Sequence, residues 1–313
     1  MSEAWHRNAE IAAADVWGDL SGASFTVVGL GKSGVAAANA LCARGAAVLC
    51  VDDAPETKLA TALAELDRRV EVHVGDPQGP AGRRGDLFVV SPGVMPHSRR
   101  FGEVRALATL VLSEIELFYR LDRADNGGLG HPIVAISGTD GKTTTTLWVA
   151  HLLRGAGHDV AVGGNIGDPL CGFVGKLSRD AVVVAEVSAF QLYTCSRFRP
   201  RSAVVTNIAA DHVDWFAGDF DAYVRTKVAV AAQMGPGDAF AINGDDAELT
   251  LHRDALADRR LAWQLFSTRR VPERGLGFDG QTLWWTPGAG AQVRLAQLQD
   301  LGCEGKHPIV GVH

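Results

Sequence analysis

The chain has 313 residues, of which 47% are hydrophobic and 21% are charged, and its formal net charge is −6 at pH 7. This length is enough for two domains with hydrophobic cores. The acidic balance argues against a nucleic-acid partner, which would need a basic surface. No run of about 20 apolar residues is present, so we expect no membrane-spanning helix.

The N-terminus and the cysteines bear on where the protein is located. Residues 1–20 carry acidic side chains and no apolar signal core, so we expect a leading amphipathic helix instead of a secretory signal. The cysteines are scattered and form no CxxC pair, which favours reduced thiols in a cytoplasmic protein. They are Cys42, Cys50, Cys171, Cys195 and Cys303.

The first part of the chain alternates predicted strands with predicted helices. Strands are expected at residues 25–30, 46–53 and 86–94, a helix at 34–45, and a strand followed by a helix within 108–121. This alternation indicates an α/β fold with a parallel sheet and helices on both faces.

After the polar, glycine-rich segment 122–132 the same pattern starts again, so we predict two domains, at residues 1–125 and 126–313. Buried strands are expected at 133–137, 180–188, 202–209 and 237–243, and a helix at 143–157. The part after Leu261 is rich in Trp and Gly and is expected to form peripheral strands.

The first glycine cluster, GLGKSG, places Gly29, Gly31 and Gly34 between a predicted strand and a predicted helix. The acidic pair Asp52–Asp53 follows at the end of the next strand. This arrangement is typical of a diphosphate held at a helix N-terminus. The residues alone leave open whether the ligand is NAD, a nucleotide sugar diphosphate or nothing, and whether the turn at 91–93 forms a second wall.

A second glycine-rich turn, residues 138–143 (GTDGKT), resembles a shortened phosphate-binding loop, with Ile136 where the full P-loop has glycine. The glycines let backbone N–H groups face phosphate oxygens, Lys142 neutralises phosphate charge, and the hydroxyl of Thr143 is suited to Mg²⁺. We therefore predict an ATP-type phosphate site here.

Several polar residues follow the other strands of the second predicted sheet. Glu186, Asp211, His212 and Asp214 come at or just after strand ends, where an α/β site is expected. Mg²⁺ prefers such oxygen ligands. For Lys227 two interpretations stay open: a surface lysine that reaches solvent, or a buried lysine with a lowered pKa.

The order and spacing of these motifs resemble the bacterial Mur ligases. The resemblance rests on GTDGKTTTT, GGNIGDPL, AEVSAFQL, NIAADHVDWF, the downstream Lys227 and INGDDAELT, and it covers the chain from Phe25 to its end. GLGKSG, SEIELFYR and SAFQL are similar to the D-glutamate-adding branch of the family.

The resemblance implies a Rossmann-like parallel-sheet domain for the UDP-linked substrate, followed by a P-loop-type α/β ATP-binding domain. The implied UDP-substrate residues are Gly31, Lys32, Ser33, Asp52, Asp53, Gly93 and Asn165. The implied ATP-binding residues are Gly138, Thr139, Asp140, Gly141, Lys142, Thr143, Thr144, Asn243 and Asp246. The implied catalytic residues are Lys142, Glu186, His212 and Lys227, and the implied metal ligands are Thr143, Glu186, His212 and Lys227.

The activity implied by the resemblance is ADP-forming addition of D-glutamate to UDP-N-acetylmuramoyl-L-alanine through an acyl phosphate, in peptidoglycan precursor synthesis. It implies ATP, Mg²⁺ and a carbamylated Lys227 in a cytoplasmic monomer. The chain departs from the family at Asp140, where Asn is commoner, and at Ala189, Ala209 and Ala210, where polar side chains are lost.

The resemblance implies a third, C-terminal ligase domain, which we expect to be absent here because the sequence stops at His313. We therefore expect a truncated chain that binds its nucleotides but is weak or inactive as a ligase. Three alternatives stay open: a sister Mur ligase that adds another amino acid, an NAD-dependent oxidoreductase, and a non-catalytic nucleotide-binding protein.

Overall fold

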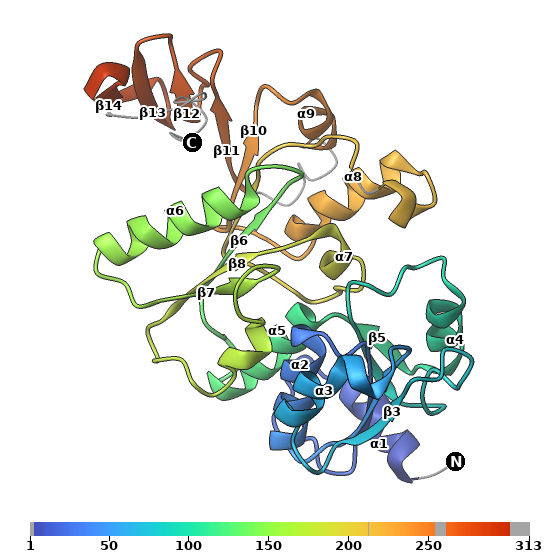
Figure 1. Ribbon diagram of the computed structural model, residues 1–313. Helices are drawn as coiled ribbons and strands as arrows, with labels where there is room; N and C mark the ends of the chain where they lie inside the picture. Colours follow the sequence, from blue (N-terminus) through green and yellow to red (C-terminus); the bar gives the residue numbers. More distant parts are fainter. Residues whose placement is uncertain (1–2, 212, 254–260, 301–313) are drawn as a thin grey trace.

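Two sheets, each with its own helices, organise the molecule (Figure 1). The computed structural model describes residues 3–211, 213–253 and 261–300. Helix α1 (Glu3–Ala13) leads into the first sheet, as predicted. The α/β architecture expected from the alternation of strands and helices is confirmed.

Within the described residues the first sheet is parallel and has the strand order β3-β2-β1-β4-β5. Its strands are β1 (Ser24–Val28), β2 (Ala47–Asp52), β3 (Glu71–Val74), β4 (Leu87–Val90) and β5 (Leu110–Leu112). The order reverses between β1 and β4, and ligands of open α/β sheets bind at the carboxyl ends of strands at such a point.

Helices cover both faces of this sheet, as the buried side chains show. They are α2 (Lys32–Ala43), α3 (Glu56–Glu65), α4 (Arg99–Leu107) and α5 (Glu114–Asp125). Phe25 and Val27 of β1 belong to the core under α2 and α5, whereas Val28 packs with Phe101 and Val104 of α4. This alternation follows from the two-residue period of a strand.

The second sheet has the order β14-β13-β12-β11-β10-β9-β6-β8-β7 among the described residues. It is parallel as far as β12, and β13 and β14 add an antiparallel hairpin at the edge. Its strands are β6 (Ile133–Ser137), β7 (Val160–Gly164), β8 (Val182–Glu186), β9 (Ser202–Val205), β10 (Ala239–Asn243), β11 (Ala262–Ser267), β12 (Gly275–Phe278), β13 (Thr282–Gly288) and β14 (Ala291–Gln297).

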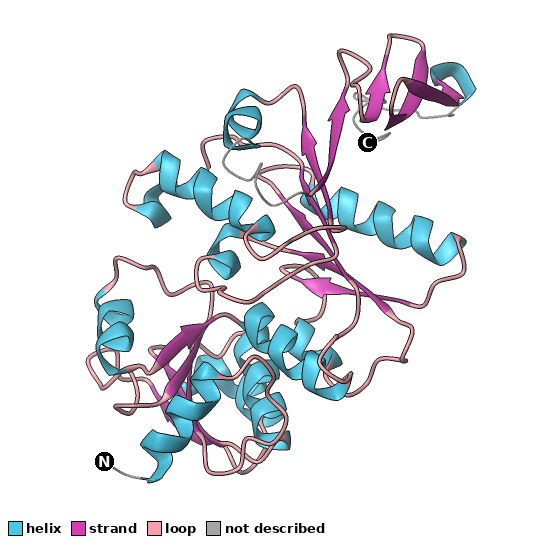
Figure 2. Ribbon diagram, turned by 180° about the vertical axis from the view of Figure 1, so that it is seen from behind, coloured by secondary structure: helices cyan, strands magenta, loops and turns pink. Residues whose placement is uncertain are grey.

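The hairpin of β13 and β14 forms a strand-rich tip at the far end of the molecule from the N-terminus (Figure 2). The peripheral strands predicted after Leu261 are thus confirmed. The strands β3 and β7 were missed, because both are short edge strands with incompletely buried side chains.

The helices of this unit are α6 (Lys142–Gly155), α7 (Ala189–Leu192), α8 (Phe220–Val228) and α9 (Ala247–Arg253). The short 3-10 helices are η1 (Leu170–Phe173), η2 (Val213–Phe216), η3 (Ala229–Ala231) and η5 (Leu298–Asp300). Helix α6 covers one face of the sheet, where Ala150 packs with Ile136 and Val184. In the described part of the chain, no helix is both long and apolar enough to cross a membrane.

The two units share one continuous core, in which η1 packs against α2 and α5 (Figure 1). The carboxylate of Glu116 in α5 is fully buried and accepts backbone N–H bonds from Ser196 (3.3 Å), Arg197 (3.0 Å) and Phe198 (2.8 Å). It also accepts a hydrogen bond from Arg120 Nε at 2.9 Å. A buried carboxylate with this many donors fixes α5 against the second unit.

The domain boundary expected between residues 125 and 126 stays a prediction. Helix α5 ends at Asp125, and the first strand of the second sheet begins at Ile133.

Candidate functional site

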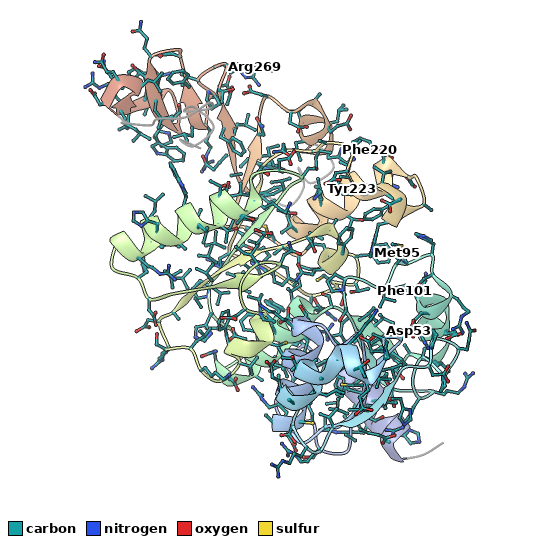
Figure 3. All side chains as sticks on the ribbon, in the orientation of Figure 1. Asp53, Met95, Phe101, Phe220, Tyr223 and Arg269 are labelled. Atoms are coloured by element: carbon teal, nitrogen blue, oxygen red, sulfur yellow. The ribbon has the colours of Figure 1, made fainter. Side chains whose placement is uncertain are left out.

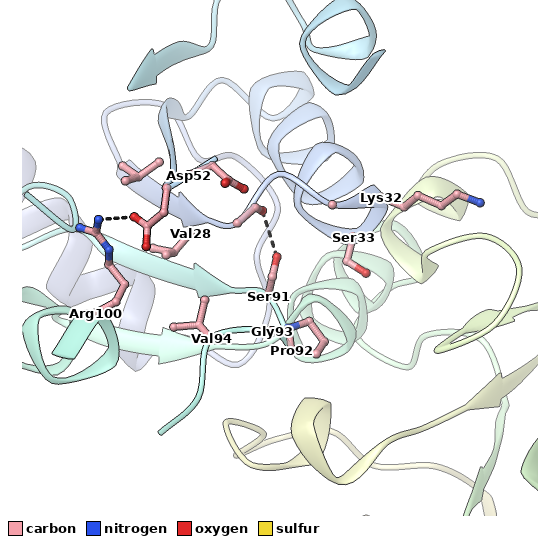
Figure 4. A pocket seen from close by; sticks show the side chains of 13 residues that line it. Val28, Lys32, Ser33, Asp52, Ser91, Pro92, Gly93, Val94 and Arg100 are labelled. Carbon is pink, nitrogen blue, oxygen red and sulfur yellow. Dashed lines mark hydrogen bonds and ion pairs between the residues drawn. The ribbon is translucent and has the colours of Figure 1, made fainter. Parts of the chain in front are cut away.

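A pocket of about 440 Å³ opens at the carboxyl ends of β1, β2 and β4 (Figure 4). Figure 4 shows Arg100 at one end of the pocket and Lys32 at the other. The pocket is lined by Val28, Gly29, Gly31, Lys32, Ser33, Val51, Asp52, Asp53, Ser91, Pro92, Gly93, Val94 and Arg100. All predicted UDP-substrate residues except Asn165 therefore line the same pocket.

The glycine turn at the floor of this pocket is tight for identifiable reasons. Gly29 has φ +95°, and a Cβ on Gly34 would lie 1.9 Å from the carbonyl oxygen of Gly29. The hydroxyl of Ser91 donates to that same oxygen at 2.9 Å. Gly31 is different, because a Cβ there would meet nothing within 4 Å.

Gly31 is also the N-cap of α2 and offers no side-chain cap to the first N–H groups of the helix. Those donors and the positive end of the helix dipole face an open approach, which suits a phosphate group. The geometry of the turn is therefore compatible with a diphosphate, as the spacing of the glycines predicted.

The two acids at the end of β2 have different surroundings. Asp52 accepts backbone N–H bonds from Leu30 (2.7 Å) and Ala54 (2.8 Å), so both of its oxygens hold the turn. Asp53 is half exposed and forms an ion pair with the buried guanidinium of Arg100. Arg100 also donates to Gly79 O at 2.7 Å, so it fixes this end of the pocket.

Arg100 was not predicted as a pocket residue, whereas the turn at 91–93, left open by the sequence, does line the pocket. The adjacent arginines 99 and 100 were visible in the sequence, but nothing there indicated that Arg100 would meet Asp53, which is 47 residues away.

The predicted phosphate loop lies between β6 and α6, at the carboxyl edge of the second sheet. Gly138 has φ +135° and Gly141 has φ +75°, and Gly141 is the N-cap of α6 without a side-chain cap. The side chain of Lys142 bends back over the loop and donates to Thr139 O at 2.7 Å. Uncapped helix N–H groups and an ammonium thus converge, which is the composition of a phosphate site.

Two residues after β9 hold the outer side of this loop. Thr206 Oγ1 and Asn207 Nδ2 donate to Asp140 O at 2.6 and 3.0 Å, and Asn207 Oδ1 accepts from Asp140 N at 2.9 Å. The main chain of Asp140 is therefore fixed, while the residue is exposed at the surface of the loop. Neither Thr206 nor Asn207 was among the predicted residues.

The next part of the site is the carboxylate of Glu186, at the end of β8 and 1% exposed. One oxygen accepts from Thr143 Oγ1 at 2.8 Å and the other from Asn165 Nδ2 at 2.8 Å. Asn165, predicted with the UDP-substrate residues, therefore lies beside the phosphate loop and outside the lining of the pocket.

The oxygen donors of Thr143 and Glu186 fit Mg²⁺, which is commonly held by one or two carboxylates together with waters and substrate phosphates. Among residues 3–211, 213–253 and 261–300, no three His, Cys, Asp or Glu side chains are grouped to hold a metal ion. The predicted ligand His212 lies outside the described residues.

Lys227, on α8, is buried, and the surface interpretation left open by the sequence is wrong. Its Nζ donates to Gly138 O at 2.6 Å and lies 4.7 Å from the centre of the Tyr223 ring. Burial, together with the nearby charge of Lys142, lowers the pKa of Lys227 to about 7, although Asp140 and Asp211 act in the opposite direction.

The two residues predicted near the adenosine, Asn243 and Asp246, lie at and just beyond the end of β10. Asn243 donates to Thr206 O at 3.2 Å, which links it to the phosphate loop. Asp246 accepts from the backbone N–H groups of Ile208 (2.7 Å) and Leu249 (3.1 Å). Their nucleotide role stays a prediction, but both border the same loop.

Each of the two units matches a known protein family. Residues 23–112 match the family described as Mur ligase MurD-like, N-terminal domain, and residues 136–271 match the Mur ligase middle domain. The first match holds the glycine turn and the second holds the phosphate loop, Glu186 and Lys227.

Among curated relatives, the UDP-N-acetylmuramoylalanine–D-glutamate ligase of Pelotomaculum thermopropionicum is 35% identical over 293 residues, covering 92% of this chain and 61% of the relative. The protein of the same name from Acidobacterium capsulatum is 36% identical over 296 residues, covering 94% and 62%. That from Trichlorobacter lovleyi is 39% identical over 222 residues, covering 71% and 48%.

The chain thus spans about three fifths of the length of the first two relatives. Among solved structures, a UDP-N-acetylmuramate–alanine ligase from Thermotoga maritima overlaps with a TM-score of 0.49 and 17% identity, covering 92% of this chain and 62% of its own.

Proposed function

This chain belongs to the Mur ligase family, of which it carries the N-terminal and middle domains, and from this we propose its function. It supplies the UDP-substrate site and the ATP site of a ligase that adds D-glutamate to UDP-N-acetylmuramoyl-L-alanine in peptidoglycan precursor synthesis. The names of its 35–36% identical relatives support this choice among Mur ligases.

The reaction we propose activates a carboxylate. An oxygen of the alanyl carboxylate attacks the γ-phosphorus of ATP, ADP leaves, and an acyl phosphate forms. The amine of D-glutamate then attacks the acyl carbon, the tetrahedral intermediate expels phosphate, and an amide bond remains. The chain contributes mainly position and charge to such a phosphoryl transfer.

The contacts described above support the following roles for individual residues. The uncapped N-terminus of α2 binds the diphosphate of the muramoyl substrate, and the loop from Gly138 with Lys142 binds the ATP phosphates. Thr143 and Glu186 would hold Mg²⁺, which supplies charge neutralisation at the phosphates. Because Lys142 is the first residue of α6, its ammonium and the positive N-terminal end of the helix dipole act together on the phosphates.

For Lys227 we propose carbamylation, in which the neutral amine attacks CO₂ and releases a proton. The buried position and the lowered pKa support it, because an amine must be deprotonated to react. The ring of Tyr223 stabilises the positively charged ammonium form. The carbamate is negatively charged, so its formation requires a compensating cation nearby. Labelled bicarbonate and carbon NMR test this, with Lys227→Arg as the control that cannot form the carbamate.

A reducing, cytoplasmic location is also part of the proposal. The cysteines of the described residues, namely Cys42, Cys50, Cys171 and Cys195, are free thiols. This supports a compartment where disulfides do not form. We further propose a monomer, which light scattering would test.

The single observation that carries the proposal is the pairing of a diphosphate-type pocket in one domain with a loop, carboxylate and buried lysine in the other. The test is a thermal shift with UDP-N-acetylmuramoyl-L-alanine, with UMP and NADH as controls. A ligand that binds only the folded state stabilises it by about 2.7 kcal/mol at a concentration of 100 Kd.

Two substitutions sharpen this test. Gly31→Ala adds a methyl group to open space, so it should leave the melting temperature of the free protein unchanged. The same methyl group should weaken the binding of UDP-N-acetylmuramoyl-L-alanine. With a non-hydrolysable ATP analogue as a further ligand, Lys142→Ala should weaken the binding of the analogue and leave the binding of UDP-N-acetylmuramoyl-L-alanine unchanged. Stabilisation by NADH alone would overturn the proposal in favour of an oxidoreductase, and binding of neither nucleotide would favour a non-catalytic protein.

A further inference from the structure

An unbroken series of aromatic side chains joins the two predicted sites. We call Phe101, Tyr193, Trp215, Phe216 and Tyr223 the aromatic bridge. Successive ring centres are 6.0 Å apart from Phe101 to Tyr193, 5.3 Å from Tyr193 to Trp215, 4.9 Å from Trp215 to Phe216 and 5.5 Å from Phe216 to Tyr223. These separations are those of favourable ring contacts.

One end of the aromatic bridge touches the wall of the pocket. Phe101 is 3% exposed and follows Arg100, the residue that holds Asp53. Trp215, in the second domain, donates from its indole Nε1 to Pro92 O at 3.3 Å. Pro92 lines the pocket, so this hydrogen bond ties the pocket wall directly to the other domain.

The other end reaches the phosphate loop. The hydroxyl of Tyr223 lies 2.9 Å from Thr139 Oγ1, which accepts from Ala209 N at 2.9 Å. Lys227 Nζ lies 4.7 Å from the centre of the same ring. Figure 3 shows Phe101 between Asp53 of the first domain and Tyr223 of the second.

Burial makes this connection stiff from Trp215 to the phosphate loop. Trp215 is 6% exposed, Phe216 8% and Tyr223 2%, so these three rings have little room to move independently, whereas Tyr193 is 40% exposed. Protein interiors are packed as densely as organic crystals, and a displaced ring therefore displaces its neighbours. A ligand that pushes on the wall at Pro92 acts on Trp215 through their hydrogen bond.

We propose that Trp215 is a positioning residue that sets the pocket wall against the phosphate loop and couples binding at the two sites. The inference rests on the proposed function, since the carboxylate to be activated belongs to a ligand of the pocket and the phosphoryl group to a ligand of the loop. These groups must meet in a near-attack geometry, to which small displacements matter. Trp215 touches neither reacting group and acts through Pro92 on one side and through Phe216 and Tyr223 on the other.

The experiment is calorimetry on the whole chain with UDP-N-acetylmuramoyl-L-alanine and with a non-hydrolysable ATP analogue and Mg²⁺. Each Kd is measured with and without the other ligand, and the ratio is the coupling factor, which is reciprocal. Trp215→Phe removes the N–H donor but keeps a ring, and Trp215→Leu removes both. Trp263→Phe is the matched control, because Trp263 packs on Phe240 in the strands away from the pocket.

We expect the unaltered chain to show a coupling factor of about five or more. Trp215→Phe should reduce it, Trp215→Leu should bring it to one, and Trp263→Phe should leave it unchanged. The Kd of each ligand alone should stay within about threefold, since neither substitution removes a ligand contact. A merely structural role would weaken the separate Kd values and leave their ratio unchanged.

Failure of the inference and failure of the proposed function are distinguishable. Absence of binding of either ligand to the unaltered chain overturns the proposed function and the inference with it. Binding of both ligands without coupling, or with a coupling factor that persists in Trp215→Phe and Trp215→Leu, overturns the inference alone. If Trp215→Leu does not fold, Trp215→Phe decides between these outcomes.

Discussion

Replacing Gly138 by alanine tests whether the phosphate loop depends on its glycines for geometric reasons. Gly138 has φ +135°, and an added Cβ would lie 1.9 Å from Thr206 Oγ1 and 3.0 Å from Thr206 N. Backbone strain of this kind costs about 1–3 kcal/mol, and overpacking costs about 1–3 kcal/mol more. We expect Gly138→Ala to lower the free energy of unfolding by about 2–6 kcal/mol.

The assay is urea denaturation followed by circular dichroism, with Gly141→Ala as the matched control. Gly141 also has a positive φ, +75°, but a Cβ there would meet nothing within 4 Å. That variant should lose only the left-handed cost of about 1–2 kcal/mol. If Gly138→Ala is no less stable than Gly141→Ala, the steric explanation for Gly138 is wrong.

A second substitution separates strain from overlap. Thr206→Ala removes the hydroxyl that the new Cβ would meet, although it also removes the hydrogen bond to Asp140 O at 2.6 Å. The double variant with Gly138→Ala should therefore be more stable than the sum of the two single losses predicts. Additive losses would show that the overlap with Thr206 contributes nothing.

Three further predictions concern polar side chains. Burial raises the pKa of Glu114 from 4.5 to about 7, so the cost of ionising this buried carboxyl is absent below pH 4.5 and complete above pH 7. The wild-type chain should therefore lose about 3 kcal/mol of unfolding free energy between pH 4.5 and 8. In urea titrations, Glu114→Gln should not show this loss. Equal pH profiles would contradict this. Glu116→Ala leaves buried Arg120 and several backbone donors without their acceptor and should cost about 3–5 kcal/mol, whereas Glu116→Ala with Arg120→Met should cost less than the sum; additivity would exclude the coupling. Thr143→Ala should weaken the Mg²⁺-dependent binding of an ATP analogue by about tenfold and Thr143→Ser should restore it; a loss that is equal with EDTA present would exclude a metal role.

The sequence predicted the parts of the protein that depend on local backbone requirements. The turn at Gly29 and the loop at Gly138 both need positive φ, which favours glycine, and strands and helices on either side have recognisable periods. The alternation of strands and helices indicated parallel sheets, and the described strands pair in parallel except at β12–β13 and β13–β14. The edge strands β3 and β7 escaped because their burial is incomplete, so their hydrophobic pattern is weak.

Family motifs extended this prediction to residues whose chemistry is not local. Lys227 is the clearest case, since the sequence around it left both a surface lysine and a buried lysine open. The structure buries it against Gly138 and Tyr223, because α8 packs on the carboxyl edge of the sheet. Only this packing removes water from the amine and lowers its pKa.

Side-chain partners far apart in the sequence were decided by the tertiary structure. Asn165 meets Glu186 across 21 residues, Asp53 meets Arg100 across 47, and Trp215 meets Pro92 across 123. Such pairs depend on strand register and on how the two domains pack, and neither leaves a pattern in the sequence between the partners. The sequence by itself therefore determined the two glycine turns and their α/β setting, and the packing of the domains determined how the two sites are joined.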